Sequence, residues 1–383
     1  MQKHILIGIA LLSLAASPLF AQEAIDKEYG DRVVFLDDDG GKQDAKRVKV
    51  ESATYEDSGV VYLLRGGRIK NEKNGSRVLM ILYGDAPRVY SEGEQNLLRG
   101  QYAKAASDFD GSKNAVDAGK CRDWLIEYAA IRRGQALTAL GRKEKGNLPD
   151  AVKEFKAALT ANPKSLLFDE IQLGLVEAYS LQKKWDEAKA AATNLLNVGK
   201  IVKQPIWQAK AQKAIADILL YQKSYSDAVS AFGDLGSLAS REGKYEKSEL
   251  RKAELAKLEV AANVEQGWAL VAWAETSGSD SDWTKARTHF EALAAKFPGD
   301  ETVAAAVLNG VGRTLMKTDP RAAYMKFVEA HVTYFNARSE VARAYYLKAQ
   351  ALNAMGGATN RQRAEEALKE LRKFFPESPF ARK

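Results

Sequence analysis

The chain has 383 residues, of which 57 are basic and 50 acidic, and its formal net charge is +7. So small an excess over this length does not by itself indicate binding to nucleic acid. The single cysteine, Cys121, excludes an intramolecular disulfide, so the fold must be stabilised by packing. Because Cys121 lies in an apolar, helix-forming context, we expect it to be a small core residue rather than a nucleophile.

Residues 1–21 have the composition of a secretory signal peptide. Met1–His4 carry a positive charge, Ile5–Leu14 are apolar, and the small residue Ala21 offers a cleavage point. The apolar run is too short to span a bilayer. An uncleaved anchor is the alternative, because Leu19 is larger than signal peptidase prefers. We expect an exported protein, periplasmic or envelope-associated, with no transmembrane span after signal removal.

Residues 22–83 are predicted to form a small β-barrel-like or sheet domain. β-branched residues alternate there between glycine turns and predict four or five short strands, among them Arg32–Leu36, Val48–Thr54, Val60–Leu64 and Arg77–Tyr83. A domain this small buries little core, so we expect it to lean on the helical region that comes after it in the chain. The run Asp37–Gly40 is interpreted as a turn rather than a calcium site, because the spaced later ligands are missing.

Residues 84–383 change to a helical period, with apolar side chains three and four positions apart. One pattern returns along them: an aromatic, a small residue three positions on, and an aromatic or aliphatic residue four beyond that. Clear copies are centred on Ala105, Ala188, Ala228 and Ala286, and weaker ones on Ala151, Ala323 and Ala364. The spacings fit one unit of about 34 residues with insertions.

This pattern resembles the tetratricopeptide repeat (TPR) family from roughly Asp85 to Pro379. A proline falls twelve residues after the central alanine three times, at Pro163, Pro298 and Pro376, as it does in the family. The resemblance implies a mainly α fold, a TPR-like α-solenoid that winds helical hairpins into a right-handed superhelix behind the small β-rich domain. A generic helical bundle with coincidental alanines is the alternative.

In such a stack the first helix of each hairpin lines a concave groove, and function depends on the side chains that face it. Residues three to four apart on a first helix share that face. The groove candidates are Glu177, Lys210, Lys213, Asp217, Asn309, Arg313, Lys317, Arg343, Tyr346 and Gln350. The later repeats therefore look basic on the inside, although a solvated helix face would carry similar charge.

No catalytic, cofactor-binding or metal-binding constellation stands out. His289 and His331 have no cysteine or acidic cluster at metal-ligand spacing, and no phosphate-binding loop is present. The stretch Arg241–Leu258 is dense in lysine and glutamate. It predicts either a docking arm or, more simply, an extended first helix.

The sequence thus favours a non-enzymatic protein–protein interaction scaffold of the bacterial cell envelope. It would bind a peptide or a partner segment in the groove of the repeats, and an acidic partner is compatible with their charge. The alternative is a permanent structural subunit of an envelope-assembly or polysaccharide-associated complex. No cofactor and no nucleic-acid partner is expected, and an enzyme ranks third.

Overall fold

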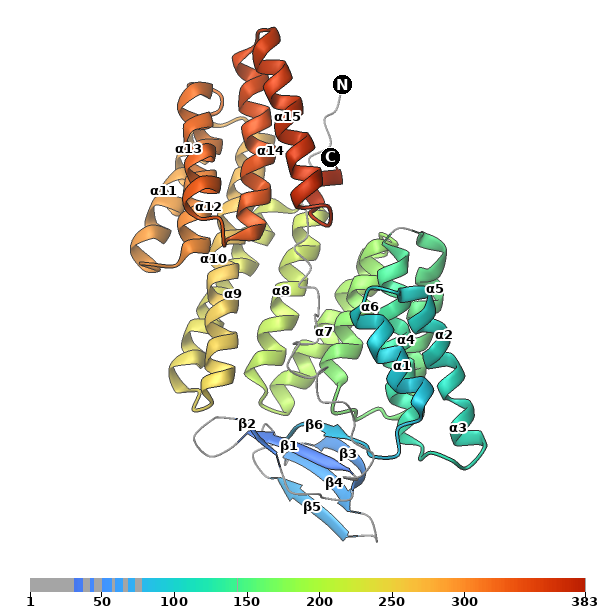
Figure 1. Cartoon of the computed structure of the whole chain (residues 1–383). Helices are drawn as coiled ribbons and strands as arrows, with labels where there is room; N and C mark the ends of the chain where they lie inside the picture. Colours follow the sequence, from blue (N-terminus) through green and yellow to red (C-terminus); the bar gives the residue numbers. More distant parts are fainter. Residues whose placement is uncertain are drawn as a thin grey trace. The chain divides into compact units, whose positions relative to one another are not determined.

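The computed structural model describes residues 31–36, 42–44, 50–56, 59–64, 68–72, 78–142 and 144–382 (Figure 1). The predicted signal peptide and the Asp37–Gly40 turn lie outside these residues. None of the described helices combines the length and the apolar character that crossing a membrane requires.

Short strands occupy the region where the sequence predicts them. They are β1 (Arg32–Leu36), β2 (Lys42–Asp44), β3 (Val50–Glu56), β4 (Gly59–Leu64), β5 (Arg68–Glu72) and β6 (Val78–Leu82). They form two antiparallel sheets of three strands, in the orders β2-β1-β6 and β3-β4-β5. Val33, Val34 and Val50 are fully buried, so these β-branched side chains form part of the core beneath the sheets.

The rest of the described chain is helical, as predicted. The long helices are α1 (Arg88–Leu98), α2 (Tyr102–Ser112), α4 (Trp124–Gly141), α5 (Leu148–Ala161), α6 (Phe168–Leu181), α7 (Trp185–Ile201), α8 (Pro205–Tyr221), α9 (Tyr225–Tyr245), α10 (Glu249–Ser277), α11 (Asp280–Lys296), α12 (Glu301–Leu315), α13 (Pro320–Thr333), α14 (Arg338–Met355) and α15 (Ala358–Phe374). Short elements are α3 (Asn114–Asp117), η1 (Lys145–Asn147) and η2 (Pro379–Arg382).

The chain forms two compact units. The N-terminal unit holds the described residues up to Ile218 together with Ala239–Ala256, and the C-terminal unit holds Leu219–Leu238 and the described residues from Lys257 onward. The predicted boundary at residues 83 and 84 marks the change from strand to helix. It does not separate the compact units, because the sheets belong to the same unit as the first hairpins.

The central small residue of the repeat lies at a helix crossing in both units. Its copies are 0–1% exposed, namely Ala105, Ala151, Ala188, Ala228, Ala286, Ala323 and Ala364. The phenylalanine four positions later is equally buried in five of them, namely Phe109, Phe155, Phe232, Phe290 and Phe327. The repeat register inferred from the sequence is therefore confirmed.

Glycines on the first helices receive these phenylalanine rings. A Cβ on Gly174 of α6 would lie 2.3 Å from Phe155 of α5, and a Cβ on Gly310 of α12 would lie 2.3 Å from Phe290 of α11. Each ring thus packs against the backbone of the next hairpin's first helix. Only glycine leaves room for that approach.

The prolines end helices as the resemblance implied. α5, α11 and α15 each end two residues before a proline, at Pro163, Pro298 and Pro376. A proline has no backbone N–H and disfavours the helical conformation of the residue before it. The local punctuation of the sequence therefore fixes where these hairpins turn.

Arg122 joins the strands to the first hairpins of the N-terminal unit. Its guanidinium donates to both carboxylate oxygens of Asp31, at 2.7 and 2.6 Å, and to those of Asp85, at 2.8 and 2.7 Å. Burial opposes ionisation of Asp85, but hydrogen bonds from Arg122 and Trp124 outweigh it and lower the pKa of that carboxyl to about 2. Tyr83 stacks on Trp124 with ring centroids 4.2 Å apart.

A second contact ties strand β3 to α6 and α8. The Tyr55 ring packs edge-on against Phe168 and Trp207, with centroids 5.4 and 5.3 Å apart, and its amide donates to the Lys164 carbonyl oxygen at 3.1 Å. The expectation that the small β region leans on the helical region is confirmed.

The charged stretch Arg241–Leu258 is divided between the end of α9 and the start of α10. α10 is 29 residues long, so the interpretation as an extended first helix holds. Part of the stretch is packed, because Leu255 is completely buried and Glu254 lies 3.1 Å from Lys210 within the N-terminal unit.

Candidate interaction groove

The first helices of the C-terminal unit bring several groove candidates together. Asn309 of α12 donates through Nδ2 to the carboxylate and to the backbone oxygen of Glu340 on α14, both at 2.9 Å. The Glu340 carboxylate lies 2.9 Å from Arg343. Two candidates that are far apart in the sequence, Asn309 and Arg343, therefore meet through one carboxylate.

Arg343 is 7% exposed in this site. Its guanidinium carbon is 4.0 Å from the centre of the Trp268 ring on α10 and 5.4 Å from that of Phe380 in η2. A second carboxylate, that of Glu265, lies 3.7 Å away. Carboxylates at its edge and an aromatic ring at its face hold the guanidinium in one orientation.

Arg313, Tyr346 and Gln350 form the adjoining part of the site. Arg313 is paired with Glu275 of α10 and lies 5.9 Å from the Trp283 ring centre. Burial raises the pKa of Tyr346, a hydrogen bond with Gln350 and the charge of Arg313 lower it, and the charge of Glu275 raises it further. These contributions place the side chains in one neighbourhood.

Two uncharged buried polar atoms of this site have no hydrogen-bond partner among the described residues. They are the indole Nε1 of Trp268 and the amide Oδ1 of Asn309. Arg343 Nη1, although close to Glu340, is not aligned for a hydrogen bond either. An unused buried donor or acceptor costs about 1–3 kcal/mol, so such atoms are uncommon unless another molecule satisfies them.

The charges of this site correct one expectation. Arg313 and Arg343 were expected to make the inside of the later repeats basic, yet they face the carboxylates of Glu265, Glu275 and Glu340. The positive charge is compensated within the unit, which removes the reason to expect an acidic partner. Lys317, beyond the end of α12, is exposed and has no ion pair in the described part of the chain.

The candidates of the N-terminal unit are engaged in ion pairs of their own. Glu177 lies 2.7 Å from Arg142, and Lys213 lies 2.8 Å from Asp217. Lys210 lies 3.2 Å from Asp169 and 3.1 Å from Glu254. The Lys213–Asp217 pair lies within α8, whereas the others connect the end of α4 to α6, α6 to α8 and α8 to α10, so they help to fix the spacing of the hairpins.

Sequence reasoning missed five residues of the site, namely Glu265, Trp268, Glu275, Glu340 and Phe380. The first three lie on α10, whose place in the repeat was obscured by the long insertion before Ala286. A glycine in the sequence could have revealed the register of α10. The Phe290 ring packs against Gly267 in the same way as the Phe155 ring packs against Gly134. That glycine sets the register of α10 and puts Trp268 beside it.

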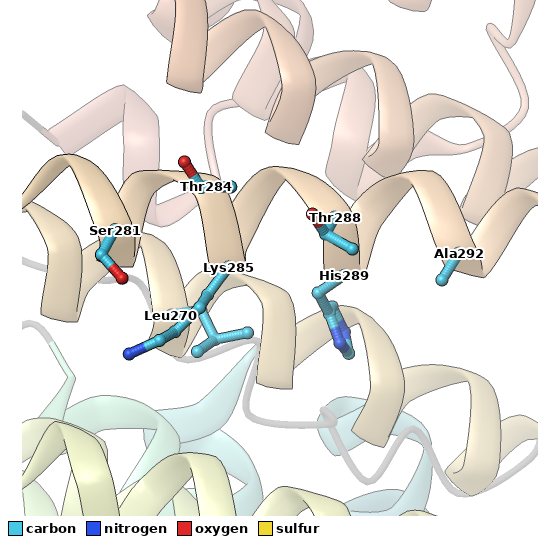
Figure 2. A pocket seen from close by; sticks show the side chains of 7 residues that line it. All are labelled: Leu270, Ser281, Thr284, Lys285, Thr288, His289 and Ala292. Atoms are coloured by element: carbon cyan, nitrogen blue, oxygen red, sulfur yellow. The ribbon is translucent and has the colours of Figure 1, made fainter.

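A separate hollow of about 690 Å³ lies on the side of α11. Figure 2 shows its lining, with Lys285 and His289 projecting on the same side as Leu270, and the full set is Leu270, Ser281, Thr284, Lys285, Thr288, His289 and Ala292. Burial lowers the pKa of His289, whose Nε2 lies 2.8 Å from the Asn263 carbonyl oxygen. None of the groove candidates lines this hollow.

No group of three or more histidine, cysteine or acidic side chains in the described residues is arranged to hold a metal ion. No protein-family model and no curated protein matches the chain. A solved structure titled "Crystal Structure of the Apo Form of RapI" matches over 76% of this chain and 77% of that chain, with 11% sequence identity and a TM-score of 0.47. A likeness at this level is too low to carry a functional argument.

Proposed function

We propose that this chain is a non-enzymatic scaffold that holds a segment of another protein against α10, α12 and α14. The observation that carries the proposal is the pair of unused buried atoms, Trp268 Nε1 and Asn309 Oδ1. One is a donor and the other an acceptor, which is what the C=O and N–H of a peptide backbone require. Because Asn309 is fully buried and Trp268 is 7% exposed, a segment that binds these two atoms has to uncover them as it binds.

A photocrosslinking amino acid in place of Gln350 tests this function, because Gln350 is partly exposed beside Tyr346. The matched control places the same group at Ala190, which is exposed on α7. We expect a discrete crosslinked product from envelope extract at position 350, and its loss when Trp268 is changed to phenylalanine. The same products from both positions would contradict the proposal.

Export belongs to this proposal and rests on the N-terminal sequence. The mature protein is expected to begin at Gln22, which the intact mass of the secreted form would test. Retention of residues 1–21 would favour the anchored alternative.

Two exposed apolar side chains favour the second candidate function, a permanent subunit of an envelope complex. Val332 and Phe335 at the end of α13 are 63% and 67% exposed. Permanent interfaces are rich in such residues. A fixed complex would survive high salt and gel filtration, whereas a transient client would dissociate under the same conditions.

A further inference from the structure

The last described segment of the chain lies on the candidate groove. After Pro376 ends α15, the chain turns through hydrogen bonds from the Ser378 amide to the Phe375 carbonyl oxygen, at 2.9 Å, and from the Ala381 amide to the Ser378 carbonyl oxygen, at 3.0 Å. η2 comes next, and its Phe380 ring centroid lies 5.6 Å from that of Tyr346 and 5.4 Å from the Arg343 guanidinium. Two groove candidates predicted from the sequence are thus contacted by the chain itself.

We infer that the groove of the C-terminal unit selects a partner segment carrying an aromatic side chain, and that Phe380 occupies this aromatic position in the unliganded protein. The inference rests on the proposed function and deepens it by giving the chemistry of the partner. η2 is then an internal competitor, which a partner displaces.

The Arg343 guanidinium explains why the position takes an aromatic ring. Its edge is engaged by Glu340 and Glu265, and a flat guanidinium offers its faces to aromatic rings. An acidic side chain placed there would meet Glu265, Glu275 and Glu340 and be repelled. An aliphatic side chain would fill the space without the attraction between the cation and the ring.

Two polar atoms of the same cluster have no hydrogen-bond partner, which indicates that η2 does not satisfy every donor and acceptor of the site. Trp268, whose ring packs against the Arg343 guanidinium, is 7% exposed. Its Nε1 atom has no hydrogen-bond partner in the described residues. The Oδ1 atom of Asn309, whose Nδ2 donates to Glu340, also has no hydrogen-bond partner in the described residues. Because both atoms are buried, a longer segment gains hydrogen bonds to them, in addition to the ring contact, only if its binding also uncovers them.

The tether sets how strongly η2 competes. A short flexible linker gives an attached group an effective concentration in the millimolar range. Phe380 therefore stays on Tyr346 and Arg343 most of the time if the intrinsic dissociation constant of its contact lies well below this concentration. A partner presented at a lower concentration displaces it only when its additional contacts outweigh this advantage.

The experiment uses the full-length chain with Phe380→Ala and a fluorescein-labelled peptide of residues Glu377–Arg382 as the probe. Fluorescence anisotropy is expected to show at least tenfold tighter binding to this variant than to the unchanged protein. A peptide with alanine in place of its phenylalanine should bind at least tenfold more weakly. Phe374→Ala, which removes an exposed ring on the neighbouring helix, is the matched control and should bind the probe like the unchanged protein.

Arg343→Lys keeps the charge and removes the flat guanidinium, so adding it to Phe380→Ala should abolish the gain. Circular dichroism melting of each variant establishes that it is folded. Equal binding of the two peptides, or no gain in Phe380→Ala, would overturn the inference. Because no natural partner is used, a failure to find a crosslinked partner at Gln350 would leave this result unaffected.

Discussion

The two units of the molecule are held together in different ways. In the N-terminal unit, Arg122 connects Asp31 ahead of β1 with Asp85 ahead of α1, across 91 and 37 positions of sequence. Polar contacts between successive first helices are common to both units, as Lys210 with Asp169 and Asn309 with Glu340 show, so the Arg122 anchor is what sets the N-terminal unit apart. A repeat stack needs only neighbour contacts, whereas attaching a sheet to it takes a specific long-range anchor.

The largest effect is expected from breaking that anchor with Arg122→Met. Removal of the guanidinium leaves the buried Asp31 and its neighbour Asp85 unpaired, which should cost about 3–5 kcal/mol. Hydrogen exchange should show protection lost in the N-terminal unit and retained in α12–α15. The control is Arg88→Met, because Arg88 is exposed and its pair with Glu92 is worth less than about 1 kcal/mol.

Equal loss of protection in both units would break the comparison. It would mean that the anchor stabilises the whole chain rather than the unit that contains it.

The next largest effect tests a feature that both units share, the packing of a phenylalanine ring against a glycine of the next hairpin. Gly174→Ala and Gly310→Ala each place a Cβ 2.3 Å from a buried phenylalanine ring, so overpacking should destabilise either unit by about 1–3 kcal/mol in urea unfolding. Gly111→Ala in α2, where nothing lies within 4 Å, should instead stabilise by about 0.5–1 kcal/mol. A gain at all three positions would show that the rings do not wedge between hairpins.

Ala188→Leu and Ala228→Leu examine the helix crossings. Both alanines are fully buried, so a larger side chain should cost roughly 1–3 kcal/mol, whereas the exposed Ala190 should accept leucine with little change. The urea midpoints of the three variants measure the difference. Identical midpoints would show that the repeat register is wrong in spite of the burial.

The smallest effect is on the acid side of the stability curve. The folded-state pKa of Asp85 is about 2, below its ordinary value of 3.8, so its contribution is complete above pH 4 and is lost as the pH falls through 2. Asp85→Asn should remove this pH dependence from the N-terminal unit. The effect is small because the Asp85 side chain is 29% exposed and partly screened by solvent. An unchanged acid limb in urea titrations at pH 2–5 would contradict the assignment.

The local rules of the sequence predicted most of the helical architecture. The repeat residues determine structure within a single hairpin, as one copy shows. Ala286 lies at the helix crossing, Phe290 packs against the next hairpin, and Pro298 ends the helix, so their spacing in the sequence predicts all three features. β2 and β5 were not predicted, because Lys42–Asp44 and Arg68–Glu72 are polar and become strands only through pairing with β1 and β4. Strand pairing is a non-local interaction that composition does not show.

For the candidate site too, local features were predicted from the sequence and non-local contacts were not. The sequence by itself predicted that five residues share the inner face of first helices, because helical periodicity fixes a face: Asn309, Arg313, Arg343, Tyr346 and Gln350. Only the tertiary structure decided that three carboxylates compensate the two arginines, that Trp268 supports Arg343, and that Phe380 reaches Tyr346. The physical reason is the range of the interactions. Helical periodicity fixes which face of its own helix a side chain lies on, whereas the residue that it contacts depends on how separate helices pack.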